Sequence, residues 1–264
     1  MNNGKVLAGI DAGHVSTKAV LMKGQEVLGY GISATGFDVV GAALTALGNV
    51  LEQAGISALD VAGIVTTGIY RDAVKDPSIE VVVTVPEYAA DARGALFLNR
   101  NSRTVIDIGG NVHKAVHYDE HGDLLDVIQN DKCADGLGLF YTSMAKALVL
   151  TEQELSELAL KSTRDVSVAI QCALSAESEA IDLLCQGIDI TDVANAVSRF
   201  LSERVAAMCT YLPLTGEIVV VGGLAKATAV VKHLSALLEK ELSVADHPEY
   251  VGAIGAVTSY GGAR

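Results

Sequence analysis

The chain has 264 residues, of which 50% are hydrophobic and 19% charged, enough apolar material for one large domain or two smaller ones. A net charge of −13 and the lack of any Lys and Arg cluster argue against a nucleic-acid-binding protein. The first residues carry no secretory signal pattern, and no apolar run is long enough to span a bilayer, so we expect a cytoplasmic protein without a membrane partner.

Strands dominate the first half of the chain. Apolar runs predict strands at residues 5–11, 17–23 and 25–33, a helix at 38–55, a strand at 61–68 and a helix at 86–98. The order then restarts, with strands predicted at 103–110, 113–119 and 122–129.

Helices dominate the second half. Apolar spacing predicts helices at residues 134–148, 152–160, 175–186 and 190–211, a strand at 217–223, and helices at 224–242 and 248–264. Near residue 133, the predicted elements change from mainly strands to mainly helices.

Two segments far apart in the chain carry nearly the same residues. "IDAGHVSTKAV" at 10–20 aligns without a gap with "IDIGGNVHKAV" at 106–116, which places Asp11 on Asp107 and Lys18 on Lys114. Each segment then turns into a third strand. An internal repeat with a long period sets the whole fold, so we expect two copies of one hairpin-led domain facing each other.

The repeated pattern permits nucleotide chemistry. Glycines after each strand let backbone N–H groups approach phosphate oxygens, and paired aspartates hold Mg²⁺ through its waters. A later Gly-Gly after an apolar strand supplies a third approach point, for the adenosine side. A single Asp-x-Gly is usually only a turn, but two copies in register favour a nucleotide cleft. The predicted site comprises catalytic, Mg²⁺-organising Asp11 and Asp107 and nucleotide-binding Gly13, Ser16, Thr17, Lys18, Gly109, Gly110, Gly222 and Gly223.

The four cysteines are the second signal. Cys133 and Cys172 each stand just before a predicted helix, where the helix N-terminus favours the thiolate that binds metal. They lie too far apart for a self-contained cluster site, so four thiolates would need two chains. On spacing alone, inert cysteines are an equal alternative. Cys185 and Cys209 fall inside predicted helices, and we expect small buried residues there.

Two histidines flank the predicted phosphate loops. His14 follows Gly13, and His113 stands shortly after Gly110. Both are within reach of a ligand, but solvated loop histidines are the interpretation that we favour.

The ordered motifs resemble a known family. "GIDAGHVSTKAVL", "TTGIYR", "VIDIGG", "NDKCADGLGLF", "KSTRDVSVAIQCALSAESEA", "VVVGGLAKA" and "YVGAIGAV" are similar to the ATPase activators of 2-hydroxyacyl-CoA dehydratases and the ATPase subunits of benzoyl-CoA reductase. The resemblance implies an α/β fold, a duplicated ribonuclease-H-like fold of the actin, Hsp70 and sugar-kinase type, with ATP between two domains. It divides the chain into residues 1–100, with 248–264 packing back on them, and residues 101–247.

The resemblance also implies an electron-transfer function. Cys133 and Cys172 would bind one 4Fe–4S cluster shared by two subunits, as a homodimer or as a heterodimer with a related ATPase subunit. A ferredoxin-like donor would reduce the cluster, and ATP turnover would drive a low-potential electron to a partner that reduces or dehydrates a CoA thioester.

Four positions depart from the commoner activator pattern. Asn111 and Val112 replace Gln-Asp, Asp91 replaces a histidine, and Ala227 replaces an asparagine. These departures raise the question of whether ATP hydrolysis is impaired. They favour, slightly, the benzoyl-CoA-reductase branch and a subunit of a hetero-oligomer.

Two other classes of protein stay open. A small-molecule kinase of the same fold would use an acid in the cleft to activate its substrate, and Glu87 and Asp91 are the candidates. A non-catalytic, actin-like ATP-binding module would have no use for paired cysteines at helix starts.

Overall fold

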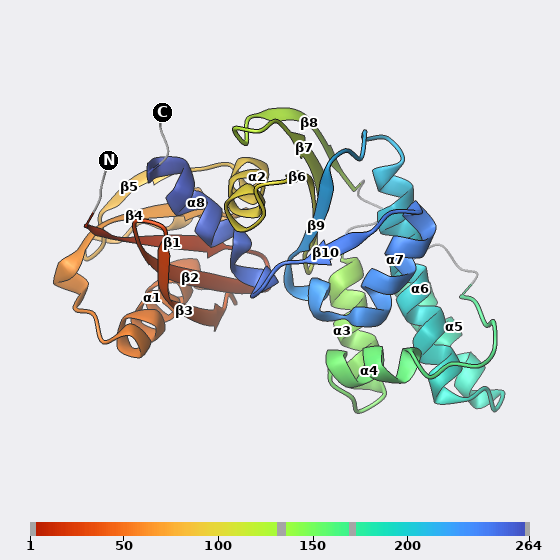
Figure 1. Ribbon diagram of the computed structural model, residues 1–264. Helices are drawn as coiled ribbons and strands as arrows, with labels where there is room; N and C mark the ends of the chain where they lie inside the picture. Colours follow the sequence, from red (N-terminus) through yellow and green to blue (C-terminus); the bar gives the residue numbers. More distant parts are fainter. Residues whose placement is uncertain (1–3, 131–135, 169–172, 262–264) are drawn as a thin grey trace.

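The structure, a computed structural model, describes residues 4–130, 136–168 and 173–261. Two lobes, each built on a five-stranded sheet, lie next to each other (Figure 1). The elements before residue 100 are β1 (Val6–Ala12), β2 (Ser16–Lys23), β3 (Glu26–Ala34), α1 (Val39–Ala54), η1 (Ala58–Asp60), β4 (Val61–Thr67), η2 (Arg71–Ala73), β5 (Val81–Thr84) and α2 (Glu87–Leu98).

The second lobe contains more helix than the first. Its elements, with the last helix of the chain, are β6 (Ser102–Ile108), β7 (His113–Tyr118), β8 (Leu124–Gln129), α3 (Leu137–Ala147), α4 (Glu152–Ala159), α5 (Ala173–Cys185), α6 (Ile190–Cys209), β9 (Glu217–Val221), η4 (Gly223–Lys226), α7 (Thr228–Leu238), β10 (Leu242–Val244), η5 (Pro248–Tyr250) and α8 (Val251–Gly261).

The two sheets have the same topology. The first runs β3-β2-β1-β4-β5 and the second β8-β7-β6-β9-β10, each with an antiparallel meander followed by two parallel strands. Asp11 pairs across the strands with Lys18, and Asp107 pairs in the same way with Lys114. The repeat predicted from the sequence is therefore confirmed.

Helices cover both faces of each sheet. Successive apolar side chains of the strands point to opposite faces of the first sheet. Helix α1 packs on one face and α8 on the other. In the second sheet, α2 covers one face and α3 to α7 the other. Helices α2 and α8 therefore lie between the two sheets and pack against each other (Figure 1). The sequence placed α2 in the first domain, and the exact domain boundaries stay a prediction.

Backbones approach very closely where α2 meets α8. A Cβ on Gly255 would lie 1.7 Å from the carbonyl oxygen of Ala90, and one on Gly94 would lie 2.2 Å from that of Val251. Only glycine allows this approach, so the small residues that the sequence shows in the last helix have a packing role.

One sequence prediction of secondary structure is wrong, and one strand was missed. Residues 224–242 do not form one helix, because Glu239 adopts a left-handed φ of 52° that ends α7, and the next residues pair as β10 with β9. Strand β5 was not predicted, since its short apolar run gives too little period-2 pattern.

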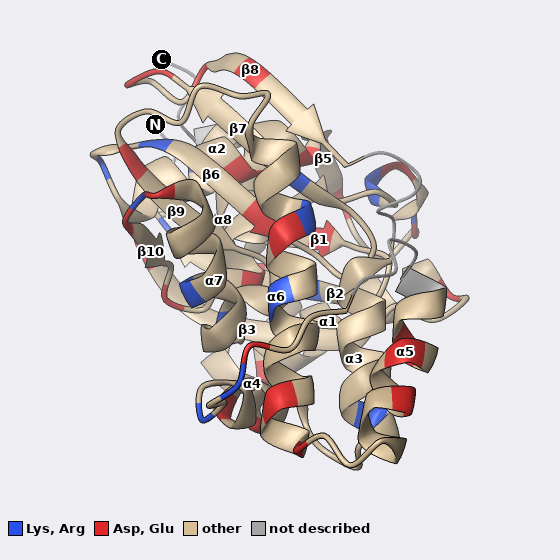
Figure 2. Cartoon of the chain, turned by 90° about the vertical axis from the view of Figure 1, so that its right-hand side faces the viewer, with Lys and Arg blue, Asp and Glu red and all other residues tan. Residues whose placement is uncertain are grey.

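Charged residues are spread along the whole chain. Acidic residues mark several turns of α5, whereas Lys and Arg are dispersed over several elements (Figure 2). In the ranges that the structure describes, no helix is both long and apolar enough to cross a membrane.

Candidate functional site

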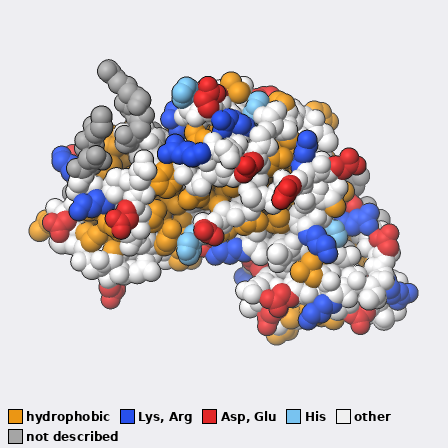
Figure 3. Space-filling model, in the orientation of Figure 1, with side chains coloured by type: hydrophobic (Ala, Val, Ile, Leu, Met, Phe, Trp, Pro, Cys, Tyr) orange, Lys and Arg blue, Asp and Glu red, His pale blue; other side chains and the backbone are white. Residues whose placement is uncertain are grey.

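A cavity of about 360 Å³ lies between the two lobes. The surface is notched at the junction of the lobes (Figure 3). The cavity walls come from the loops after β1, β6 and β9 and from the first turns of α2 and α8. Most of the sequence-predicted binding residues line it, namely Asp11, Gly13, Ser16, Lys18, Asp107, Gly109, Gly110, Gly222 and Gly223. Residues from both copies of the repeat thus face one space.

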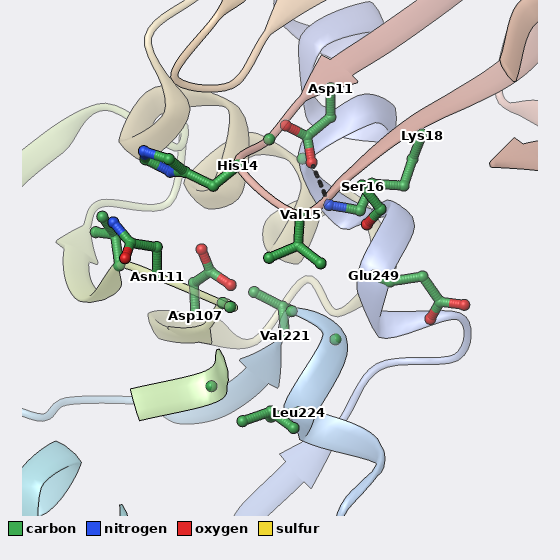
Figure 4. Close-up of a pocket in the computed structure, with 18 of the residues that line it drawn as sticks. Asp11, His14, Val15, Ser16, Lys18, Asp107, Asn111, Val221, Leu224 and Glu249 are labelled. Carbon is green, nitrogen blue, oxygen red and sulfur yellow. Dashed lines mark hydrogen bonds and ion pairs between the residues drawn. The ribbon is translucent and has the colours of Figure 1, made fainter. Parts of the chain in front are cut away.

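The loop between β1 and β2 forms the first wall. Lys18 Nζ lies 3.4 Å from Asp11 Oδ2, and these side chains are 15% and 16% exposed. Asp11 and Lys18 lie on one side of the pocket and Asp107 on the other, with Val15 between them (Figure 4). Thr17 does not line the cavity, because its side chain is buried behind the loop.

The second wall centres on a buried lysine. Lys114 Nζ lies 2.6 Å from Asp107 Oδ2, 3.2 Å from Asp91 Oδ2 and 3.4 Å from Glu87 Oε1, and its side chain is 5% exposed. The two last carboxyls come from consecutive turns of α2, so this cluster ties α2 to the second sheet.

Burial and charge act in opposite directions on this cluster. Burial alone would lower the pKa of Lys114, but the carboxylates of Asp107, Asp91 and Glu87 raise that pKa well above its usual range. Burial raises the pKa of Asp91 well above its usual range despite Lys114, and raises the pKa of Glu87 against the same lysine. Lys114 is therefore a cation at neutral pH, and Asp91 is displaced toward its neutral form.

The third wall follows β9. Gly222 has a φ of 89°, and a Cβ there would lie 2.3 Å from Asp107 Oδ1, so the position admits only glycine. Lys226 and Glu249 also line the cavity, and Lys226 Nζ forms an ion pair with Glu249 Oε1 at 2.5 Å.

The loop between β6 and β7 is bonded to the start of α3. The Leu139 N–H donates to the Gly110 carbonyl and the Gly136 N–H to the Asn111 carbonyl, each at 2.8 Å. A Cβ on Gly138 would lie 2.4 Å from the Gly109 carbonyl oxygen. This loop and α3 cannot move independently without breaking these contacts.

A second cavity, of about 450 Å³, adjoins the first. The two share Thr142, Glu152, Gly223 and Lys226, from α3, α4 and η4. The Thr142 hydroxyl donates to Glu152 Oε1 at 2.5 Å. Small-molecule sites measure about 300–1,000 Å³, so the two cavities together are large enough for a polyphosphate and a nucleoside.

Several lining residues were not predicted from the sequence. Lys114 could have been found, because the repeat aligns it with Lys18. Thr142 and Glu152 carry no comparable signal, since only the packing of α3 on α4 brings them to the cavity.

The positions that depart from the activator pattern all lie at the cavities. Asp91, Asn111 and Val112 line the first cavity, and Ala227 lines the adjoining one. The departures therefore concern the site rather than distant surface.

The two histidines that the sequence analysis singled out differ in their exposure. His14 is exposed and lines the cavity, and the centroid of its ring lies 5.3 Å from that of Tyr70. The side chain of His113 is buried, with 1% exposed, so the prediction of a solvated loop histidine is wrong for His113.

Cys209 is buried as predicted, and burial raises its pKa to about 12. Cys185 is exposed, which corrects its prediction, because that face of α5 is turned to solvent.

The described part of the chain holds no group of three or more His, Cys, Asp or Glu arranged to bind a metal ion. Cys133 and Cys172, predicted to bind iron, lie outside the described residues.

Comparison with known proteins identifies relatives over nearly the whole chain. The model of the BadF/BadG/BcrA/BcrD ATPase family matches residues 8–259. The chain is 34% identical to the (R)-2-hydroxyglutaryl-CoA dehydratase activating ATPase of Acidaminococcus fermentans, over 94% of each protein. It is 29% identical to one of the subunits of benzoyl-CoA reductase from Thauera aromatica, over 80% of this chain and 75% of that protein.

Solved structures show the same fold. The activator of the 2-hydroxyisocaproyl-CoA dehydratase from Clostridium difficile, solved with bound ADPNP, superposes with a TM-score of 0.88 at 28% identity, over 98% of each chain. A ROK family glucokinase from Streptomyces griseus superposes with a TM-score of 0.58 at 14% identity, over 95% of this chain and 97% of that one. The second likeness shows the fold alone and confirms the fold class predicted from the sequence.

Proposed function

Because the chain belongs to the BadF/BadG/BcrA/BcrD ATPase family, we propose that it is an ATP-hydrolysing iron–sulfur protein that delivers a low-potential electron to a CoA-thioester enzyme. The observation that carries this proposal is the duplicated Asp–Lys pair, whose two copies face one cavity beside glycine loops.

The cavity suits Mg²⁺ and a nucleoside triphosphate. Asp11 and Asp107 present carboxylates from opposite walls, and the described chain offers no larger metal-binding group. Mg²⁺ usually takes one or two carboxylates and completes its shell with water and phosphate oxygens. When bound, Mg²⁺ neutralises charge between the phosphates and the carboxylates. The adjoining cavity, with Thr142 and Glu152, would hold the nucleoside.

Glu87 is the acid best placed to orient a water molecule. Its side chain is 26% exposed and lines the cavity, whereas Asp91 is 8% exposed and displaced toward its neutral form. A carboxylate with a raised pKa is a better proton acceptor than an ordinary one. We therefore assign water positioning to Glu87 and a structural contact with Lys114 to Asp91.

The contacts of α3 supply a route from nucleotide to cluster. The Gly110 and Asn111 carbonyls are held by N–H groups of Leu139 and Gly136. Cys133 stands a few residues before this helix in the sequence. A phosphate that moves the loop would displace the start of α3 with it.

The cluster ligands are proposed from sequence order. Cys133 precedes α3 and Cys172 directly precedes α5, and these two helices contact each other. Two such cysteines supply half of the thiolates of a 4Fe–4S cluster, so a second chain would supply the rest. When bound, the cluster carries the electron.

The partner is proposed from the relatives. Their names specify a dehydratase activator and a component of benzoyl-CoA reductase, both connected with CoA thioesters. The chain is 34% identical to the first of these relatives and 29% identical to the second, so we propose a CoA-thioester enzyme of either kind as the partner.

Iron content under anaerobic conditions tests the cluster. Cys133→Ala and Cys172→Ala should each abolish the brown colour and the bound iron, because each removes a required thiolate. Cys185→Ala and Cys209→Ala serve as controls and should retain iron. Full iron in Cys172→Ala would overturn the ligand assignment, and a wild-type protein that never binds iron would favour a kinase of the same fold.

A further inference from the structure

Two buried threonines lie behind the loop between β1 and β2. Thr17 and Thr35 are 0% and 2% exposed, and their hydroxyl oxygens are 2.9 Å apart. The Thr35 hydroxyl donates to the Gly13 carbonyl at 2.8 Å, and the Thr35 N–H donates to the Val15 carbonyl at 3.0 Å. Thr35, the residue that directly follows β3, therefore holds two carbonyls of the loop that lines the cavity.

The direction of each hydrogen bond follows from the number of protons. A threonine hydroxyl has one proton, and that of Thr35 is used on the Gly13 carbonyl. The bond between the two hydroxyls must then be donated by Thr17. Thr17 thus fixes the orientation of Thr35, although it does not line the cavity.

The carbonyl directions determine where the next amides point. The described backbone has no cis peptide bonds, and in a trans peptide the N–H of the following residue points opposite to the carbonyl. With the Gly13 and Val15 carbonyls turned to Thr35, the N–H groups of His14 and Ser16 point away from it. His14 and Ser16 both line the cavity.

The corresponding loop in the second copy of the repeat is also held through its carbonyls. The Gly110 and Asn111 carbonyls accept from the N–H groups of Leu139 and Gly136. In the first copy, Thr35 holds the Gly13 and Val15 carbonyls.

We propose that Thr35, held by Thr17, is the positioning residue that aims the His14 and Ser16 amides at the phosphates of the nucleotide. The assignment rests on the proposed function, since it takes the cavity ligand to be a nucleoside phosphate. Without the Thr35 hydroxyl, the Gly13 carbonyl loses its partner and its peptide is free to turn.

The test compares kinetics and binding in matched variants. Thr35→Val keeps the side-chain shape and should raise the KM for MgATP about tenfold, with kcat changed less than about twofold, because amide contacts to phosphate bind substrate and transition state alike. The Kd for MgADP, measured by calorimetry, should rise by a similar factor. Thr35→Ser should restore both values, because serine keeps the hydroxyl.

Two further variants separate positioning from folding. Thr17→Val should weaken nucleotide binding less than Thr35→Val does. Thr66→Val is the control, because Thr66 is buried in β4 of the same sheet, and its hydroxyl has no hydrogen-bond partner within the described chain. It should leave KM, Kd and the melting temperature near wild type.

The outcomes separate the role of Thr35 from the proposed function. If the wild type binds MgADP but does not hydrolyse ATP, the proposed function fails and the calorimetric comparison still decides the role of Thr35. Wild-type Kd and KM in folded Thr35→Val, or a wild type that binds no MgADP, would overturn the positioning role. If Thr35→Val does not fold, wild-type Kd in Thr17→Val together with weak binding in Thr35→Ser would overturn it.

Discussion

Lys18 and Lys114 hold equivalent positions in the two copies of the repeat, yet their surroundings differ. Lys114 is surrounded by three carboxyl groups, whereas Lys18 has one, that of Asp11. An ammonium has three donors, so Lys18 keeps donors for a ligand and Lys114 does not. At the residue scale, the duplicated site is therefore asymmetric, with Lys18 available to phosphate and Lys114 committed to structure.

This asymmetry predicts the effect of Lys18→Gln. The variant should raise the KM for MgATP by roughly 10- to 100-fold, because a charge-assisted contact of about 1.5–3 kcal/mol is lost. Lys23→Gln, at the exposed end of the same strand, is the matched control and should leave KM unchanged. Steady-state ATP hydrolysis measures both, and equal KM values in the two variants would exclude the phosphate contact.

Asp91 predicts a pH dependence of stability. Its pKa is raised by burial, so the folded state binds a proton more tightly than the unfolded state does. The stability contributed by the neutral acid is present below the ordinary Asp pKa and is lost as the pH rises toward the raised value. Asp91→Asn removes this loss while retaining a side chain of the same shape.

Urea unfolding of the wild type and Asp91→Asn, between about pH 4 and about pH 7, measures the difference. The free energy of unfolding of the variant, relative to wild type, should increase as the pH rises. Asp91 is not assigned to the metal, so the comparison needs no nucleotide. A relative stability that is constant or falls with pH would contradict the raised pKa.

At the scale of elements, the contact between α2 and α8 carries the connection between the lobes. Gly255 of α8 faces the backbone of Ala90 in α2, where a Cβ would lie 1.7 Å from a carbonyl oxygen. Backbone atoms cannot move aside as a flexible side chain can. The two helices would have to separate, and each is packed on a different sheet.

Gly255→Ala should therefore destabilise the protein by about 1–3 kcal/mol or more, the usual range for overpacking. Gly48→Ala is the matched control, since Gly48 is an exposed position of α1 with nothing within 4 Å of its added Cβ. It should stabilise by about 0.5–1 kcal/mol, because alanine favours the helix. Chemical denaturation of both variants checks the pair, and equal effects would show that the α2–α8 contact can open.

The sequence predicts those elements whose signals are local. The two Asp-x-Gly strands and their cross-strand lysines repeat within a short window, so the duplication and most of the cavity lining could be recognised before the structure was known. Strand β10 could not, because its pairing with β9 is a tertiary contact that overrides the helical pattern of residues 224–242. Thr17 shows the same limit, because its side chain contacts Thr35, a residue 18 positions further along the chain, and the local sequence does not show this contact.

At the scale of the whole molecule, two lobes share one cavity and one link to the proposed cluster. The first lobe contributes Asp11 and Lys18, and the second contributes Asp107 and the loop bonded to α3. A ligand shifts a conformational equilibrium only when its affinity differs between the two states. In the proposed function, the γ-phosphate would supply such a difference, because it would contact the loop of Gly110 only while ATP is bound.

The midpoint potential of the cluster, titrated anaerobically with saturating MgATP and then with MgADP, is the sharpest test of coupling between the cleft and the cluster. We predict that the two potentials differ. Each tenfold difference between the oxidised and the reduced protein in their relative affinity for the two nucleotides corresponds to about 59 mV for a one-electron couple. The shift should disappear in Asp107→Asn if this chain carries the switch. Identical potentials with the two nucleotides, in a protein that binds both and holds its iron, would contradict the claim that the cleft controls the electron.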